Sequence, residues 1–182
     1  MIYLETGRML LRPFAAEDER DLHAIFEDPE VMAFVEPTYT AEQTRDFLHS
    51  FCLRREPPGA FAAVRRGESR VIGYVLFKEM SGDVYELGWI FNRAYWQQGY
   101  AYEVCRALVH HAFTVLNARR IYAATANSPA SMATMRTLGF SHEGPFRQHR
   151  RLPGGALTDT FCDGQLRGEY EGRDYCSDKK RQ

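Results

Sequence analysis

A strand-like segment that leads through a glycine-containing loop into a long amphipathic helix limits the folds open to this chain more than any other feature. The segment YELGWIF (85–91) has the β-branched and aromatic content of a strand. After the loop AYWQQGYA (94–101), apolar residues recur at helical spacing, at Ala101, Val104, Cys105, Leu108, Ala112, Val115 and Leu116. The sequence therefore predicts a strand, a loop and a helix that begins near Gly99.

The start of this helix is suited to an anion. The first turn of a helix leaves four N–H groups without partners inside the helix and carries about half a positive charge. Gly99 and Ala101 keep the approach to these groups open. We therefore expect a diphosphate-binding loop, while the local sequence alone leaves open an ordinary glycine-containing helix start.

Two helices are predicted near the N-terminus, after a short strand at 8–14. The acidic segment 15–26 has apolar residues at helical spacing. The capping box TAEQ (40–43) opens a second helix, which should run to about residue 54. The connector 28–39 between the two helices is expected to be irregular.

The middle of the chain predicts a sheet with both strand orientations. Residues 60–91 are typical of three antiparallel strands, with turns at 66–69 and 81–83. The segment 121–126, which follows the long helix, is a further strand. A strand, a helix and a strand in this order make a parallel crossover beside the antiparallel strands.

The C-terminal part predicts a short helix and a hairpin. Ser128 is a good N-cap, Pro129 suits the first helical position and Gly139 suits the end, so the helix spans 129–138. Residues 146–166 form a hairpin that completes the sheet.

Periodicity is lost beyond Gly168. We expect a single domain at 1–170 and a loosely ordered tail at 171–182.

Composition narrows the class of protein. The 182 residues suit one domain, the net charge of −1 gives no general attraction to nucleic acid, and no apolar run approaches the ~20 residues of a membrane span. We expect a cytoplasmic protein without a membrane segment or a metal site. The four cysteines lack the spacing of a zinc or redox motif and are expected to be free thiols: Cys52, Cys105, Cys162 and Cys176.

Three motifs, ELGW (86–89), WQQGYAYE (96–103) and NSPASMATMRTLGF (127–140), occur in the order seen in the GNAT superfamily of N-acetyltransferases. Over about residues 8–170 the chain resembles the ribosomal-protein N-acetyltransferase branch of that superfamily. The resemblance implies an α/β (α+β) fold. Its sheet is mixed and mostly antiparallel, with about seven strands, about four flanking helices and a splayed pair of parallel strands.

The resemblance also implies acetyl-coenzyme A as cosubstrate, bound at the loop. The superfamily pattern has Gln or Arg, two residues, Gly, one residue and then Gly or Ala; Trp96 stands at its first position. The branch has an Asn where Ser128 stands here, and Asn127 lies one residue early. The implied cofactor-binding residues are Ile90, Phe91, Gln97, Gln98, Gly99, Tyr100, Ala101, Tyr102 and Asn127.

Acyl transfer to an amine needs a neutral amine, donors aimed at the developing oxyanion and a proton for the departing thiolate. Glu86 matches a glutamate frequent in the superfamily and is the candidate base, acting through water; a carboxylate paired with an arginine is the alternative. The oxyanion donor would be a backbone N–H near Ile90. Met135 stands where many members have a tyrosine acid, and Ser131 takes the place of the branch's serine; Ser131 could instead cap the helix.

The leading hypothesis is an N-acetyltransferase that moves an acetyl group from acetyl-coenzyme A to a primary amine by direct attack in a ternary complex. The amine could belong to a protein N-terminus or to a small molecule. A non-catalytic acyl-coenzyme A sensor module is the alternative. Nucleic-acid binding through the basic hairpin is opposed by the charge balance. The sequence leaves open the acceptor and whether the chain forms a homodimer.

The two N-terminal helices and their connector carry aromatic residues that we expect to be exposed. By the same resemblance this segment borders the acceptor site: Phe34, Tyr39, Phe47 and Phe51. For Phe47 and Phe51, four residues apart, packing in the core is the favoured role. The hairpin carries the basic residues Arg147, His149, Arg150 and Arg151. A solvated strand edge is the favoured interpretation of this basic cluster.

Overall fold

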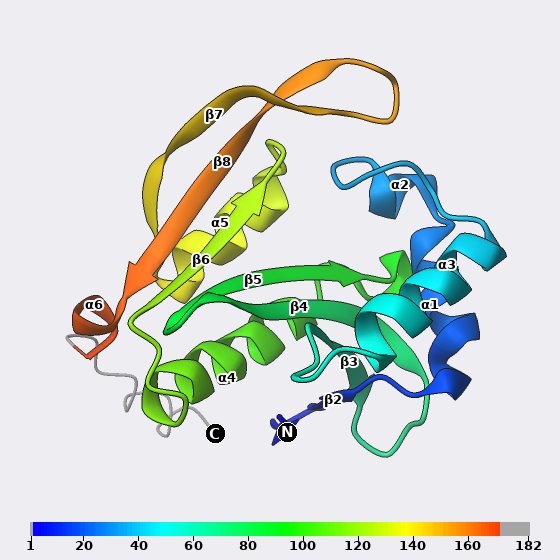
Figure 1. The fold of residues 1–182 in the computed structure, drawn as a ribbon, viewed down its shortest axis with the longest axis horizontal. Helices are drawn as coiled ribbons and strands as arrows, with labels where there is room; N and C mark the ends of the chain where they lie inside the picture. The colour runs from blue at the N-terminus through cyan, green and yellow to red at the C-terminus, as the bar shows by residue number, and fades with distance from the viewer. Residues whose placement is uncertain (1, 172–182) are drawn as a thin grey trace.

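The computed structural model describes residues 2–171, which contain an eight-stranded sheet (Figure 1). Its strands are β1 (Leu4–Glu5), β2 (Met9–Pro13), β3 (Ala60–Arg65), β4 (Val71–Ser81), β5 (Val84–Phe91), β6 (Arg120–Thr125), β7 (Ser141–Arg151) and β8 (Leu157–Leu166). The order across the sheet is β1-β2-β3-β4-β5-β6-β8-β7, and every pair of neighbours is antiparallel except β5 and β6. This confirms the predicted mixed, mostly antiparallel sheet with one parallel pair.

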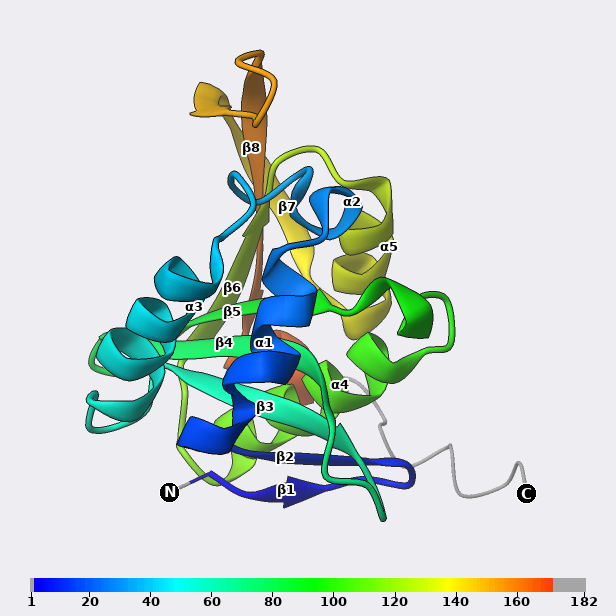
Figure 2. The same cartoon turned by 90° about the vertical axis from the view of Figure 1, so that its right-hand side faces the viewer.

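Helices cover both faces of this sheet (Figure 2). One face carries α1 (Glu19–Phe26), α2 (Pro29–Met32) and α3 (Ala41–Phe47), and the other carries α4 (Tyr100–Thr114), α5 (Pro129–Leu138) and α6 (Arg167–Glu171). Each face has its own buried core. Leu22 and Leu48 belong to the first, and Leu108 and Ile121 belong to the second. No helix within residues 2–171 has both the length and the apolar character to span a bilayer.

The central helix α4 begins where the sequence predicts. Gly99 is its N-cap and has the left-handed φ of 79°, which glycine adopts without a side-chain clash. The predicted apolar stripe is buried from Val104 to Ala112. The prediction is wrong for Val115, which is 65% exposed because the helix stops at Thr114, whereas Leu116 still packs against the core.

The N-terminal connector is more regular than predicted. Asp28 accepts a hydrogen bond from the Glu30 backbone N–H (2.9 Å), and Pro29 takes the first helical position, so the connector contains α2. The predicted capping box at Thr40 is present, but α3 ends at Phe47 and the chain continues as a π-helix, Leu48–Leu53. Strand β1 was not predicted because two residues show no alternation.

The last described helix, α6, includes Glu171, the first residue of the predicted tail. Beyond Gly168 the chain still forms the last turn of α6, because Tyr170 is buried and stacks on Phe113 with ring centroids 4.9 Å apart. The remainder of the predicted tail, 172–182, lies outside the described residues, as does Cys176. The other cysteines, Cys52, Cys105 and Cys162, are free thiols.

Candidate active site

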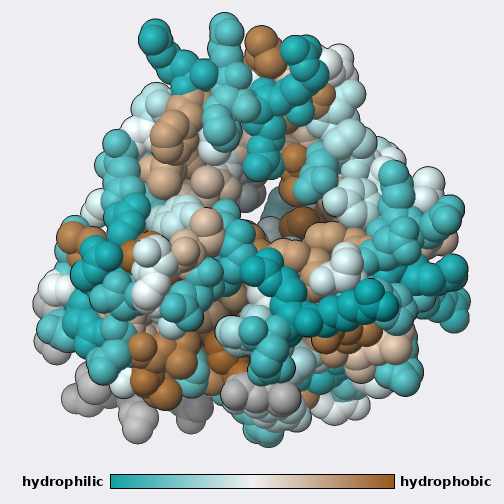
Figure 3. All heavy atoms as spheres, viewed as in Figure 1, coloured by the Kyte–Doolittle hydropathy of each residue, from teal (hydrophilic) through white to brown (hydrophobic). Residues whose placement is uncertain are grey.

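The two parallel strands β5 and β6 pair along only part of their length. Pairing is confined to residues 84–86 of β5 and 120–122 of β6, although β5 continues to Phe91 and β6 to Thr125. Beyond these pairs the strands splay apart, and a cavity of about 250 Å³ opens between them. Figure 3 shows a hollow with hydrophobic surface inside it, between the β7–β8 hairpin and the side that carries α2 and α3.

The edge of β5 that faces the gap has unpaired backbone groups. The Asn92 N–H donates to the Ile72 carbonyl (2.9 Å), and hydrogen-bonded pairs alternate along antiparallel strands, so Ile90 directs its N–H and C=O toward Tyr74 on β4. The same alternation points the backbone groups of Leu87 and Trp89 toward β6. The register pair Glu86 with Tyr122 takes up the Leu87 N–H, so the Leu87 carbonyl and both groups of Trp89 face the gap. Of the N–H groups near Ile90, where we expected the oxyanion donor, that of Trp89 therefore faces the gap.

Trp96 lies at the C-terminal end of β5 and bonds to its gap-facing edge. Its indole Nε1–H donates to the carbonyl of Phe91 (2.8 Å), the next residue of β5 whose backbone faces the gap. The side chain at the unusual position of the loop pattern thus ties the loop to the strand. The carbonyl of Phe91 is occupied by this bond.

The loop before α4 exposes backbone donors. The first intrahelical hydrogen bond of α4 runs from the Glu103 N–H to the Gly99 carbonyl (3.0 Å), which leaves the N–H groups of residues 100–102 without helical partners. No side-chain cap covers them among the described residues. Gln97 has a left-handed φ of 58° beside the 79° of Gly99, so the loop turns sharply at both residues. This geometry fits the pyrophosphate of a coenzyme.

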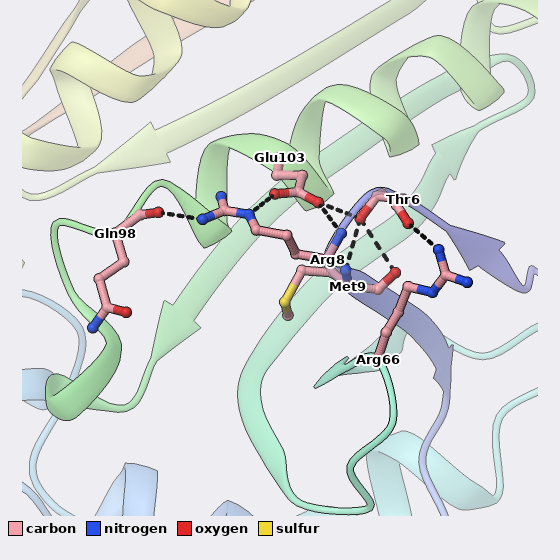
Figure 4. Close-up of polar contacts among 6 residues, drawn as sticks. All are labelled: Thr6, Arg8, Met9, Arg66, Gln98 and Glu103. Atoms are coloured by element: carbon pink, nitrogen blue, oxygen red, sulfur yellow. Dashed lines mark hydrogen bonds and ion pairs between the residues drawn. The ribbon is translucent and has the colours of Figure 1, made fainter. Parts of the chain in front are cut away.

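A polar cluster that the sequence did not predict holds this loop (Figure 4). The Arg8 guanidinium donates from Nε to Glu103 (2.6 Å) and from Nη1 to the carbonyl of Gln98 (3.0 Å). Glu103 also accepts from the Thr6 hydroxyl (2.5 Å). Burial alone would raise the pKa of Glu103, but the hydrogen bonds from Thr6 and Arg8 outweigh it and leave the pKa below its ordinary value.

Glu86 and Ser131, the two predicted catalytic residues, line the same cavity from β5 and α5. Glu86 lies opposite Lys78 in the register of β4 and β5, and the Lys78 Nζ is 3.4 Å from its carboxylate. The ion pair that we considered as an alternative role therefore exists, with a lysine in place of an arginine. A side chain about a quarter exposed can hold this ion pair and still reach a ligand in the cavity.

At the start of α5, capping falls to Ser128. Its side chain accepts from the Ser131 N–H (3.4 Å), so the capping role that we considered for Ser131 belongs to Ser128. The Ser131 hydroxyl makes no hydrogen bond within residues 2–171. Met135 is buried and also lines the cavity, whereas Asn127 is exposed, has a φ of 55° and does not line it.

The side of the cavity formed by α1, α3 and β4 is aromatic. Phe26 contacts Tyr39, Phe47 and Tyr74 with ring centroids 5.3 to 5.6 Å apart. Burial and a hydrogen bond to Glu36 raise the pKa of Tyr39 to about 12, and burial raises the pKa of Tyr74 still further, so both phenols are neutral at pH 7. The predicted core role of Phe47 is confirmed, and Phe47 also lines the cavity.

Of the basic hairpin residues, Arg150 alone lines the cavity. It is half-buried and donates to the Val35 carbonyl (2.9 Å), whereas Arg147, His149 and Arg151 are exposed. Arg150 therefore joins the hairpin to the connector after α2 across 115 residues of sequence. Local patterns contain no signal for such a contact.

Within residues 2–171 there is no group of three side chains suited to a metal ion.

Comparisons with known proteins agree with this geometry. The family model described as an acetyltransferase (GNAT) domain matches residues 8–141. The chain is 30% identical over 151 residues to YnaD of Bacillus subtilis (strain 168), named an uncharacterized N-acetyltransferase, and the match spans 81% of this chain and 87% of YnaD.

Solved structures share the fold over nearly the whole chain. The GNAT-family acetyltransferase from Bacillus anthracis is 26% identical, with a TM-score of 0.83 over 92% of this chain and 99% of that one. The ribosomal L7/L12 α-N-protein acetyltransferase RimL, in complex with coenzyme A, is 17% identical, with a TM-score of 0.79 over 91% of this chain and 98% of that one. At that identity the likeness shows the fold alone.

Proposed function

The chain belongs to the GNAT family of acetyltransferases, and we propose that it moves the acetyl group of acetyl-coenzyme A to a primary amine by direct attack in a ternary complex. The observation that carries this proposal is the cavity between the splayed strands. Glu86 and Ser131 line it from two elements, and the unpaired edge of β5 borders it. Both substrates can therefore meet there without a covalent enzyme intermediate.

The cosubstrate would lie along two backbone surfaces. The open N–H groups of residues 100–102 suit its pyrophosphate. The gap-facing Leu87 carbonyl and the N–H and C=O of Trp89 suit the amides of its pantetheine arm. A side chain at Gly99 would be strained by the left-handed φ of 79°. These features support the proposed placement of Gln97, Gln98, Gly99, Tyr100, Ala101 and Tyr102 at the cofactor.

Glu86 would take the proton of the amine, through water. An alkyl ammonium with a pKa near 10.4 costs about 4 to 5 kcal/mol to deprotonate at pH 7, so such an acceptor needs a base. As the nitrogen bonds to the acetyl carbon, the bond from that carbon to sulfur breaks. The Ser131 hydroxyl would donate to the leaving sulfur, and the Trp89 N–H on the β5 edge would donate to the carbonyl oxygen.

The lining of the cavity favours an amine on an apolar body. The rings of Phe26, Tyr39 and Phe47 offer apolar surface and π faces, and Glu36 and Glu86 attract a cation. A polyamine, which carries charge along its whole length, would bury less apolar surface against the rings. We therefore expect the best acceptors to carry an aromatic or aliphatic group next to the amine, as a small molecule or as the N-terminal residue of a peptide.

A thiol-release assay with a panel of amines tests the proposal. Acetyl-coenzyme A is supplied with amines matched in length, one series with an aromatic body and one with a hydroxylated body, and mass spectrometry identifies the acetylated nitrogen. We expect amine-dependent thiol release and higher kcat/KM for the aromatic series. Tight binding of acetyl-coenzyme A without thiol release from any amine would contradict the proposed transfer.

A further inference from the structure

The peptide unit between Gln98 and Gly99 is held from outside the loop. The Gln98 carbonyl accepts from Nη1 of Arg8 at 3.0 Å, across 90 residues of sequence (Figure 4). The other bonds of the loop fix earlier residues: the Gln98 side chain donates to the Ala94 carbonyl (3.0 Å), and the Ala94 N–H donates to Asn92 (3.1 Å). Within residues 2–171, Arg8 is the sole hydrogen-bond donor to the Gln98 carbonyl.

Arg8 is itself fixed against α4. Its Nε donates to one oxygen of Glu103 (2.6 Å) and its backbone N–H donates to the other (2.8 Å). The guanidinium lies over the ring of Tyr100, 4.5 Å from its centroid. The Thr6 hydroxyl donates to the same carboxylate at 2.5 Å. A planar guanidinium held at two positions and stacked on a ring has little freedom left, so the position of Nη1 is set.

The orientation of this peptide decides where the Gly99 N–H points. A trans peptide unit is planar, and its C=O and N–H point in opposite directions. With the Gln98 carbonyl turned toward Arg8, the Gly99 N–H points away from Arg8. Glycine tolerates other backbone angles at little cost, so the sequence of the loop alone does not fix this orientation.

Arg8 also balances a charge that would oppose an anion. Glu103 lies in the first turn of α4, near the N–H groups that we assign to the pyrophosphate. Its pKa is lowered, so it is ionised at neutral pH, and an unpaired carboxylate there would repel a phosphate. The ion pair with Arg8 removes that repulsion.

We propose that Arg8 is a positioning residue for the cofactor loop: it fixes the Gln98–Gly99 peptide so that the Gly99 N–H joins the open N–H groups of α4 in binding the pyrophosphate. This inference rests on the proposed function, because it needs the cosubstrate at this loop. Arg8 thereby links the N-terminal hairpin β1–β2 to cosubstrate affinity.

Arg66 provides the matched control. It belongs to the same part of the structure and donates to the Thr6 carbonyl (3.3 Å), but its bonds reach the β1–β2 hairpin and not the loop. Calorimetry with coenzyme A gives a readout that does not depend on turnover. We expect Arg8→Ala to weaken binding about ten- to a hundredfold, the usual effect of losing a charge-assisted contact, and Arg66→Ala to leave it unchanged.

Two acetyl donors separate positioning from a general loss of structure. S-acetylpantetheine lacks the pyrophosphate, so Arg8→Ala should lower kcat/KM for acetyl-coenzyme A while leaving kcat/KM for S-acetylpantetheine and kcat at saturation unchanged. Arg8→Lys keeps the charge opposite Glu103 but lacks the rigid fork, so it should recover only part of the affinity.

Equal losses with both donors, or an unchanged dissociation constant for coenzyme A in folded Arg8→Ala and Arg8→Lys, would overturn the role of Arg8. Failure of the unmodified protein to bind coenzyme A would instead overturn the proposed function.

Discussion

The helices α4 and α5 each follow one strand of the splayed pair, but the backbone N–H groups of their first turns differ in whether a side chain caps them. At α4, the N-cap is Gly99, and within the described residues no side chain covers the N–H groups of the first turn. At α5, the Ser128 side chain accepts the Ser131 N–H, and Pro129 removes one donor altogether. An open helix start can bind an anion, whereas a closed one can only present side chains. We therefore place binding at α4 and chemistry at α5, through the Ser131 hydroxyl.

Substitution of Gly99 gives the most direct test of the proposed difference between the two helix starts. A valine there would need a left-handed φ that β-branched residues avoid, so the loop would rearrange and its N–H groups would no longer converge. We expect Gly99→Val to weaken coenzyme A binding about a thousandfold, as for losing two hydrogen bonds to a charged group. Calorimetry measures the change.

The control for strain is Gly67, which has nearly the same φ, 80°, and nothing within 4 Å of an added Cβ. Gly67→Val should lose similar thermal stability and keep its affinity for coenzyme A. A folded Gly99→Val protein that binds as tightly as the unmodified protein would remove the phosphate site from this loop.

The two helix starts also show what can be read from a sequence. Gly99, Ser128 and Pro129 act within a few residues of themselves, so local patterns predicted both helices and their caps. The Asp28-Pro29 cap of α2 was equally local and was overlooked.

Contacts between distant segments could not be predicted. Arg8 meets Glu103 across 95 residues, and Arg150 meets Val35 across 115. Each depends on which strands become neighbours and on rotamers that packing selects, and no periodicity records either. The counter-ion of Glu86 was predicted in kind but not in identity, because the register of β4 against β5 places Lys78 there.

A second prediction tests the chemical role at α5. Ser131→Ala removes the hydroxyl but keeps the backbone N–H that Ser128 caps. If the hydroxyl donates to the leaving sulfur, kcat should fall about ten- to a thousandfold, with little change in melting temperature or in coenzyme A affinity. Steady-state kinetics and thermal unfolding on one preparation give both quantities. An unchanged kcat would leave α5 with a structural role alone.

A third prediction concerns Glu86, which faces the same cavity from β5. Glu86→Gln keeps the shape but cannot accept a proton, so the defect exists only while the amine is protonated. The loss in kcat/KM should be about ten- to a hundredfold near pH 7 and should shrink as pH rises toward the pKa of the acceptor. Profiles from pH 6.5 to 9.5 test this. A constant deficit would mean that Glu86 positions the amine, and no deficit would leave it as the partner of Lys78.

The smallest effect is expected from substitution of Ser128, which caps α5 and to which we assign no contact with a substrate. Ser128→Ala removes the cap of α5 but no group that we place at the substrates, so it should cost about 1 kcal/mol of stability. For a chain of this size that is a fall of about 2 to 4 °C in melting temperature. Because the free N–H groups of α5 gain no ligand, coenzyme A should not restore the loss beyond its effect on the unmodified protein. A coenzyme A-dependent recovery specific to Ser128→Ala would show that the start of α5 also binds an anion, and the assignment of binding to α4 alone would then be wrong.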